Sequence, residues 1–169
     1  MNRQLRIAGI IKESIVDGPG IRLVVFTQGC RHNCPGCHNP NSHSFEGGTL
    51  VDISFILQQI TSNPLLDGVT LSGGEPFEQA EILAELAREI KKLGLNIMTY
   101  TGYKFEYLLA HSDAHPGWSE LLEQTDILVD GRFDMEKKNL LLRFRGSENQ
   151  RIIDVRKSLL DSEPALLDW

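Results

Sequence analysis

The stretch "IRLVVF" occupies Ile21 to Phe26, and a polar loop that holds every cysteine of the chain follows it within a few residues. Three more apolar runs have the same character: "GVTL" from Gly68, "LNIMTY" from Leu95 and "DILVD" from Asp126. Short apolar runs bounded by Gly or Asp are typical of strands that are buried on both faces of a sheet. The four runs therefore predict the centre of a parallel sheet.

Amphipathic helices are predicted between these strands. Apolar residues recur at helical spacing from Ile53 to Ile60, after a predicted N-cap at Asp52, and again from Ile82 to Leu93. A third helical region, over residues 104–124, is broken near the Pro-Gly pair at 116–117. Strands alternating with helices indicate βαβ units with right-handed crossovers.

The chain has 169 residues, whereas a closed eight-fold β/α barrel takes about 250. We therefore predict the α/β class, as a partial (open) β/α barrel with a mainly parallel sheet of five or six strands. One domain is expected over residues 1–169, with a core of about 16–155 and a tail over 156–169.

Composition and charge narrow the function classes. The chain is 41% hydrophobic and 24% charged, with a formal net charge of -6, which disfavours general nucleic-acid binding. No apolar run approaches the ~20 residues of a membrane span, and clustered, odd-numbered cysteines without an export signal predict a cytoplasmic protein. Eight of the 17 Lys and Arg residues lie between Arg132 and Lys157, against four acidic residues. That excess is either a solvated face or a docking surface for an acidic partner.

Polar, glycine-rich stretches follow all four predicted strands. They are the cysteine loop, "SGGEP" from Ser72, "TYTGYK" from Thr99 and "DGRF" from Asp130. Because chemistry gathers at the carboxyl ends of parallel strands, these stretches are expected to share one site.

The loop "GCRHNCPGCHNP" (Gly29 to Pro40) contains Cys30, Cys34 and Cys37. Three thiols suit several sites. A structural zinc would need a fourth ligand, which His32, His38 or His43 could supply. A reactive thiol is a second alternative. An iron-sulfur cluster normally uses four thiolates, so three would leave one iron open to a small molecule.

Two other strand ends have candidate ligand-binding residues. Gly73 and Gly74 would let the backbone approach a ligand closely, and the Glu75 carboxylate could bind an ammonium group, although a plain strand-to-helix turn would look alike. Asp130 is either a ligand contact or the cap of its own loop.

These motifs resemble those of radical S-adenosylmethionine enzymes, and within them the activating proteins of glycyl-radical enzymes. The supporting stretches are "VDGPGIR" from Val16, "GCRHNCPGCHNP", "LSGGEP", "TGYK", "LVDGRF" and "RGSENQ", which ends at Gln150. The last three point to the activases of anaerobic ribonucleotide reductase.

The resemblance implies a [4Fe-4S] cluster on Cys30, Cys34 and Cys37, whose fourth iron binds S-adenosylmethionine. It implies that Gly73, Gly74 and Glu75 hold the methionyl amino group and that Asp130 lies near the same ligand. Backbone at Gly36, Cys37 and His38 is expected along the adenine, although Gly36 replaces the aromatic residue common in the superfamily. A loop facing the partner is expected at Asp17, Gly18, Pro19 and Gly20.

The resemblance further implies that reductive cleavage of S-adenosylmethionine yields a 5'-deoxyadenosyl radical, which takes a hydrogen from a glycine of the reductase. No side chain is then needed as acid or base. A flavodoxin or ferredoxin would supply the electron, since three cysteines cannot hold a second cluster. The alternatives are an activase of another glycyl-radical enzyme such as pyruvate formate-lyase, a small-molecule radical enzyme, and a zinc-binding interaction module.

Overall fold

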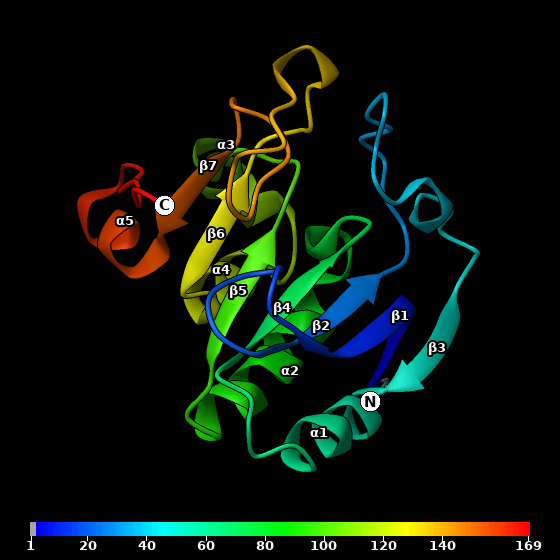
Figure 1. The fold of residues 1–169 in the computed structure, drawn as a ribbon. Helices are drawn as coiled ribbons and strands as arrows, with labels where there is room; N and C mark the ends of the chain where they lie inside the picture. The colour runs from blue at the N-terminus through cyan, green and yellow to red at the C-terminus, as the bar shows by residue number, and fades with distance from the viewer. Residues whose placement is uncertain (1–2) are drawn as a thin grey trace.

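The computed structural model describes residues 3–169, in which seven strands form one sheet (Figure 1). In their order along the sheet, the strands are β3 (Thr49–Asp52), β1 (Gln4–Ser14), β2 (Arg22–Thr27), β4 (Gly68–Gly73), β5 (Asn96–Tyr100), β6 (Ile127–Asp130) and β7 (Arg151–Asp154). The pairs β2–β4, β4–β5 and β5–β6 are parallel, and the outer pairs are antiparallel. The parallel centre consists of the four apolar runs that the sequence predicted, which confirms the α/β class.

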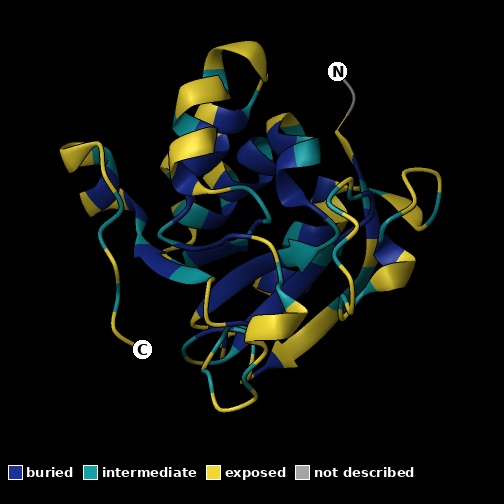
Figure 2. Cartoon of the chain, turned by 90° about the horizontal axis from the view of Figure 1, so that it is seen from above, coloured by how far each residue is buried: buried dark blue, intermediate teal, exposed yellow. Residues whose placement is uncertain are grey.

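Helices cover one face of this sheet. They are α1 (Ile53–Thr61), α2 (Ala80–Lys92), α3 (Phe105–His111), α4 (Trp118–Gln124) and α5 (Val155–Asp161). Short 3-10 turns accompany them: η1 (Pro40–Ser42), η2 (Pro76–Gln79), η3 (Ser112–Ala114) and η4 (Met135–Lys137). The predicted cap is present, because the Asp52 side chain accepts a hydrogen bond from the backbone N–H of Ser54. Alternate strand residues pack against the apolar stripe of α2 in the main core. Figure 2 shows the central strands mostly buried, with exposed residues on the outer sides of the helices and on the loops.

The other face of the sheet is crossed by the loop between β1 and β2 (Figure 1). Thr70, in the middle of β4, donates through its hydroxyl to the carbonyl of Asp17 at 2.7 Å. The guanidinium of Arg22 is fully buried and donates to the Thr70 hydroxyl at 2.7 Å and to the carbonyl of Pro19 at 3.0 Å. Burial lowers the pKa of Arg22 to about 10. The loop is therefore fixed across the sheet, on the side away from the helices.

The strand number differs from the expected five or six, because the three outer strands were not predicted. β1 alternates poorly, with register shifts between Ile7 and Gly9 and between Ile11 and Ser14. β3 and β7 have four residues each, and each pairs on one side only along the sheet. Edge strands need less apolar surface than central strands, so their sequences give a weaker signal.

The tail over 156–169 returns along β7. It begins within helix α5, and Leu167 then donates through its backbone N–H to the carbonyl of Ile152 at 2.8 Å. Among residues 3–169, none of the helices has the length and apolar character required to cross a bilayer.

Candidate functional site

A cavity of about 410 Å³ lies at the carboxyl ends of β2, β4, β5 and β6. Each strand end contributes to its wall. The strand-end residues that line it are Cys30, Cys34, Cys37, Ser72, Gly73, Gly74, Thr101, Gly102, Gly131, Arg132 and Phe133. Val16 and Asp17 of the β1–β2 loop also line it. The expectation that the four glycine-rich stretches share one site is confirmed.

Backbone hydrogen bonds hold the ends of the cysteine loop. The N–H of Cys30 donates to the carbonyl of His43 at 3.0 Å, and the N–H of Gly29 donates to the carbonyl of Ser42 at 2.7 Å. All three cysteines are free and half-buried. Burial raises the pKa of the Cys30 thiol to about 11, and burial likewise raises the pKa of Cys34. Burial therefore disfavours a thiolate at Cys30 and Cys34, and a metal cation bound to the sulfur would stabilise it.

The three thiols fit an iron-sulfur cluster, both in the chemistry of their sulfur atoms and in their position around one cavity. Soft thiolate ligands favour such clusters, and the three sulfur-bearing residues line one cavity. Within residues 3–169, no three His, Cys, Asp or Glu side chains form a group that could hold a metal ion as they stand. A four-iron cluster needs a wider arrangement than a single ion, because each thiolate bonds a different iron of the cube.

The two glycines after β4 make room for backbone. A Cβ at Gly74 would lie 2.5 Å from the carbonyl oxygen of Gly29, and a Cβ at Gly73 would lie 2.3 Å from the backbone nitrogen of Thr27. Gly73 also has a φ of 98°, which favours glycine. These glycines therefore allow the end of β4 to pack against the start of the cysteine loop, while their free side forms part of the cavity wall.

Glu75 lies beneath the cavity wall and does not line the cavity. Its side chain is 0% exposed. The carboxylate accepts hydrogen bonds from His32 Nε2 at 2.6 Å, from the Thr101 hydroxyl at 2.9 Å, and from the backbone N–H groups of Gly102 at 2.7 Å and Phe77 at 3.0 Å. The carboxylate thus links the cysteine loop, the end of β5 and η2. The contact with an ammonium group stays a prediction.

Asp130 is also turned inward. It is 1% exposed, and it accepts from Arg151 at 2.5 Å and from the backbone N–H of Phe105 at 2.8 Å. Arg151 pairs with Glu106 as well, and those hydrogen bonds lower the pKa of Glu106. At this strand end, Gly131 and the two residues after it line the cavity, and the place of Asp130 near a ligand stays a prediction.

Of the remaining predicted residues, some line the cavity and others do not. Cys37 and His38 line the cavity, and the ring of His38 makes an edge contact with Phe133 at 5.2 Å between centroids. Gly36 does not line it; a Cβ there would meet the Met135 sulfur at 2.4 Å. Of the predicted partner-facing loop, Asp17 reaches the cavity. Gly18, Pro19 and Gly20 pack beside Arg22 and Asp67.

Several wall residues were missed by sequence reasoning. Phe26 lines the cavity from β2, and Arg145 lines it from "RGSENQ". In that motif the Gln150 side chain accepts from the backbone N–H of Gly146 at 2.9 Å and donates to the carbonyl of Gly131 at 3.1 Å. The sequence analysis used this motif as part of the family resemblance. Its role in shaping the loop after β6 depends on contacts that the sequence does not specify.

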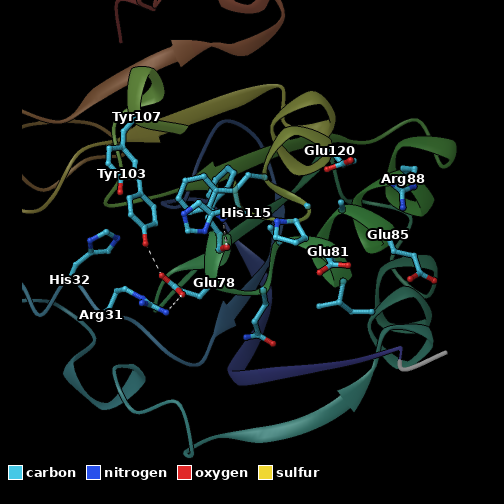
Figure 3. Close-up of a pocket in the computed structure, with 18 of the residues that line it drawn as sticks. Arg31, His32, Glu78, Glu81, Glu85, Arg88, Tyr103, Tyr107, His115 and Glu120 are labelled. Carbon is cyan, nitrogen blue, oxygen red and sulfur yellow. Dashed lines mark hydrogen bonds and ion pairs between the residues drawn. The ribbon is translucent and has the colours of Figure 1, made fainter. Parts of the chain in front are cut away.

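A larger hollow of about 1090 Å³ lies on the other side of the cysteine loop. His32 lines both hollows, with its side chain 4% exposed. In Figure 3, Tyr103 and Arg31 both reach Glu78 at the end of the hollow near His32. The cysteines do not line this hollow, so the smaller cavity is the candidate site.

The sequence of this chain is similar to those of known proteins. A family model described as "4Fe-4S single cluster domain" matches residues 16–153. The anaerobic ribonucleoside-triphosphate reductase-activating protein of Haemophilus influenzae is 35% identical over 82% of this chain and 90% of its own length, and that of Escherichia coli K12 is 32% identical over 84% and 94%. Pyruvate formate-lyase-activating enzyme of Clostridium pasteurianum is 38% identical over 64% of this chain and 49% of its own length.

These likenesses confirm the predicted radical S-adenosylmethionine activase, with its iron-sulfur cofactor, at the level of the family. The chain belongs to the family of anaerobic ribonucleoside-triphosphate reductase-activating proteins.

Proposed function

We propose that this protein installs a glycyl radical in an anaerobic ribonucleoside-triphosphate reductase. The observation that carries the proposal is the convergence of three free thiols and three glycine-rich strand ends on one cavity. When bound there, a reduced [4Fe-4S] cluster with S-adenosylmethionine supplies the one-electron cleavage that leads to hydrogen abstraction from a glycine Cα.

In this proposal the chain's own residues bind, position and exclude water. Cys30, Cys34 and Cys37 hold the cluster. Backbone at Gly73 and Gly74 borders the methionyl end, and Cys37 and His38 border the adenine. Glu75 and Asp130 are positioning residues, because hydrogen bonds within the protein already occupy their carboxylates. No residue serves as acid or base.

Partners and location follow from the same chemistry. The glycine-bearing strand of the reductase must enter the cavity, past Val16 and Asp17. An external one-electron carrier, a flavodoxin or ferredoxin, supplies the electron, because all three cysteines are committed to one cluster. We place the protein in the cytoplasm, where thiols stay reduced; its three cysteines are free.

Electron paramagnetic resonance tests the proposal. The reconstituted protein, S-adenosylmethionine and a reductant are incubated anaerobically with the reductase or with pyruvate formate-lyase. A glycyl doublet in the reductase supports the proposal, and a doublet in the lyase alone contradicts the assigned partner. Cleavage that needs no protein partner and yields a modified small molecule would indicate a small-molecule enzyme. Bound zinc without iron would indicate an interaction module.

A further inference from the structure

Two neighbouring leucines stand almost free of the protein on the loop after β6. Leu140 is 83% exposed and Leu141 is 91% exposed. Single exposed apolar side chains are ordinary on protein surfaces, but adjacent ones on a projecting loop are typical of interaction sites. We call Leu140 and Leu141 the leucine tip.

The loop that presents the leucine tip is fixed by its own hydrogen bonds. Lys138 and Ser147 form an antiparallel bridge at its base. The Asn139 side chain accepts from the backbone N–H of Leu141 at 2.9 Å and donates to Glu148 at 3.1 Å. Because the tip is already ordered, a partner that covers it loses little free energy to ordering.

The leucine tip adjoins the cavity. Leu142, the next residue, lines the cavity, as do Phe144 and Arg145 further along the same loop. Val16, which lines the cavity from the β1–β2 loop, is also strongly exposed. A protein that inserts a strand into the cavity therefore reaches the tip without a separate interface.

The residues that flank the tip directly in sequence carry charge of one sign. The stretch Lys137 to Arg145 contains four basic residues and no acidic residue. Lys137, Lys138 and Arg143 are exposed and take part in none of the ion pairs found within residues 3–169. The complementary surface is an apolar hollow bordered by carboxylates.

We propose that the leucine tip docks into such a hollow on the glycine-bearing reductase. This inference rests on the proposed function. It assigns two tasks to the loop after β6. Leu142, Phe144 and Arg145 form part of the cavity wall, and the leucine tip holds the partner whose strand enters that cavity.

The test compares two double variants. Leu140→Ser with Leu141→Ser removes the tip. Leu65→Ser with Leu160→Ser removes two other exposed leucines, which lie outside the cavity wall and serve as the control. Anaerobic interferometry with immobilised reductase measures Kd, and S-adenosylmethionine cleavage is measured separately without reductase.

We expect the tip variant to bind the reductase at least tenfold more weakly, which corresponds to about 1.4 kcal/mol. The control variant should keep the wild-type Kd, and both should cleave S-adenosylmethionine at the wild-type rate without reductase. Raising the ionic strength should weaken wild-type binding. The glycyl-radical yield of the tip variant should fall at limiting reductase and recover at high reductase.

Three outcomes would overturn the inference. An unchanged Kd in the tip variant would refute the docking role while leaving the proposed function standing. A wild-type homodimer that dissociates in the tip variant, with unchanged reductase binding, would show that a second copy covers the tip. A wild-type protein that neither binds the reductase nor forms the glycyl radical would refute the proposed function and this inference together.

Discussion

Replacing Glu75 by Gln tests whether this carboxylate is a positioning residue or a ligand contact. The carboxylate meets only donors: His32 Nε2, the Thr101 hydroxyl, and the N–H groups of Gly102 and Phe77. The Gly102 N–H faces one carboxylate oxygen and the Phe77 N–H faces the other. Whichever way a glutamine side chain is turned, its amide nitrogen therefore faces one of these two N–H groups.

The magnitude follows from that clash of donors. One backbone N–H and one amide N–H would be left buried without an acceptor, and each costs about 1–3 kcal/mol. We expect the free energy of unfolding of the metal-free protein to fall by about 2–6 kcal/mol. Urea denaturation followed by circular dichroism, under reducing conditions, measures it. Glu123→Gln, the same change on the exposed side of α4, should stay within about 0.5 kcal/mol of wild type.

The two roles of Glu75 give different results. If it positions the cysteine loop, the variant loses stability before any cofactor is added. If it contacts the methionyl ammonium group directly, the metal-free stability stays at the wild-type value and only the affinity for S-adenosylmethionine falls. The second pattern would refute the role of Glu75 as an anchor of the cysteine loop.

Three further predictions concern the cysteine loop. Each single Cys→Ala variant should fold like wild type by circular dichroism yet lose cluster binding and S-adenosylmethionine cleavage; normal cleavage in all three would contradict the assigned ligands. Gly74→Val should lower the urea midpoint even of the metal-free protein, because its Cβ would lie 2.5 Å from the Gly29 carbonyl oxygen. The control Gly9→Val should lower that midpoint much less, because no atom lies within 4 Å of its Cβ. Equal midpoints would refute that packing argument. At pH 8 the Cys30 thiol of metal-free protein, with its pKa raised to about 11, should react with iodoacetamide at least about tenfold more slowly than after denaturation, as read by mass spectrometry; equal rates would contradict the burial effect.

The sequence predicted the centre of the fold because central parallel strands must be apolar on both faces. The apolar run from Ile21 to Phe26 predicted a buried strand. The apolar stripes of α1 and α2, with the cap at Asp52, predicted the two helices. The sequence did not predict β1, β3 and β7, because these outer strands satisfy only part of that requirement. Their pairing is decided by tertiary packing, which a local pattern does not contain.

The location of the candidate site was predictable, but the direction of its side chains was not. Strand polarity alone brings the cysteine loop, Gly73 and Gly131 to one edge of the sheet. Whether Glu75 points into the cavity or beneath it depends on donors such as Thr101, which is 26 residues away in sequence. Asp130 depends in the same way on Arg151, 21 residues away. Buried carboxylates turn toward such partners because unpaired burial is costly.

The central claim is that three thiolates hold a four-iron cluster with one iron open to S-adenosylmethionine. The most direct measurement is the electron paramagnetic resonance spectrum of the anaerobically reconstituted, reduced protein before and after S-adenosylmethionine is added. We predict an iron-sulfur signal that changes when the sulfonium ligand binds the open iron. A metal centre whose spectrum stays the same at saturating S-adenosylmethionine, or a protein that takes up no iron, would contradict the account.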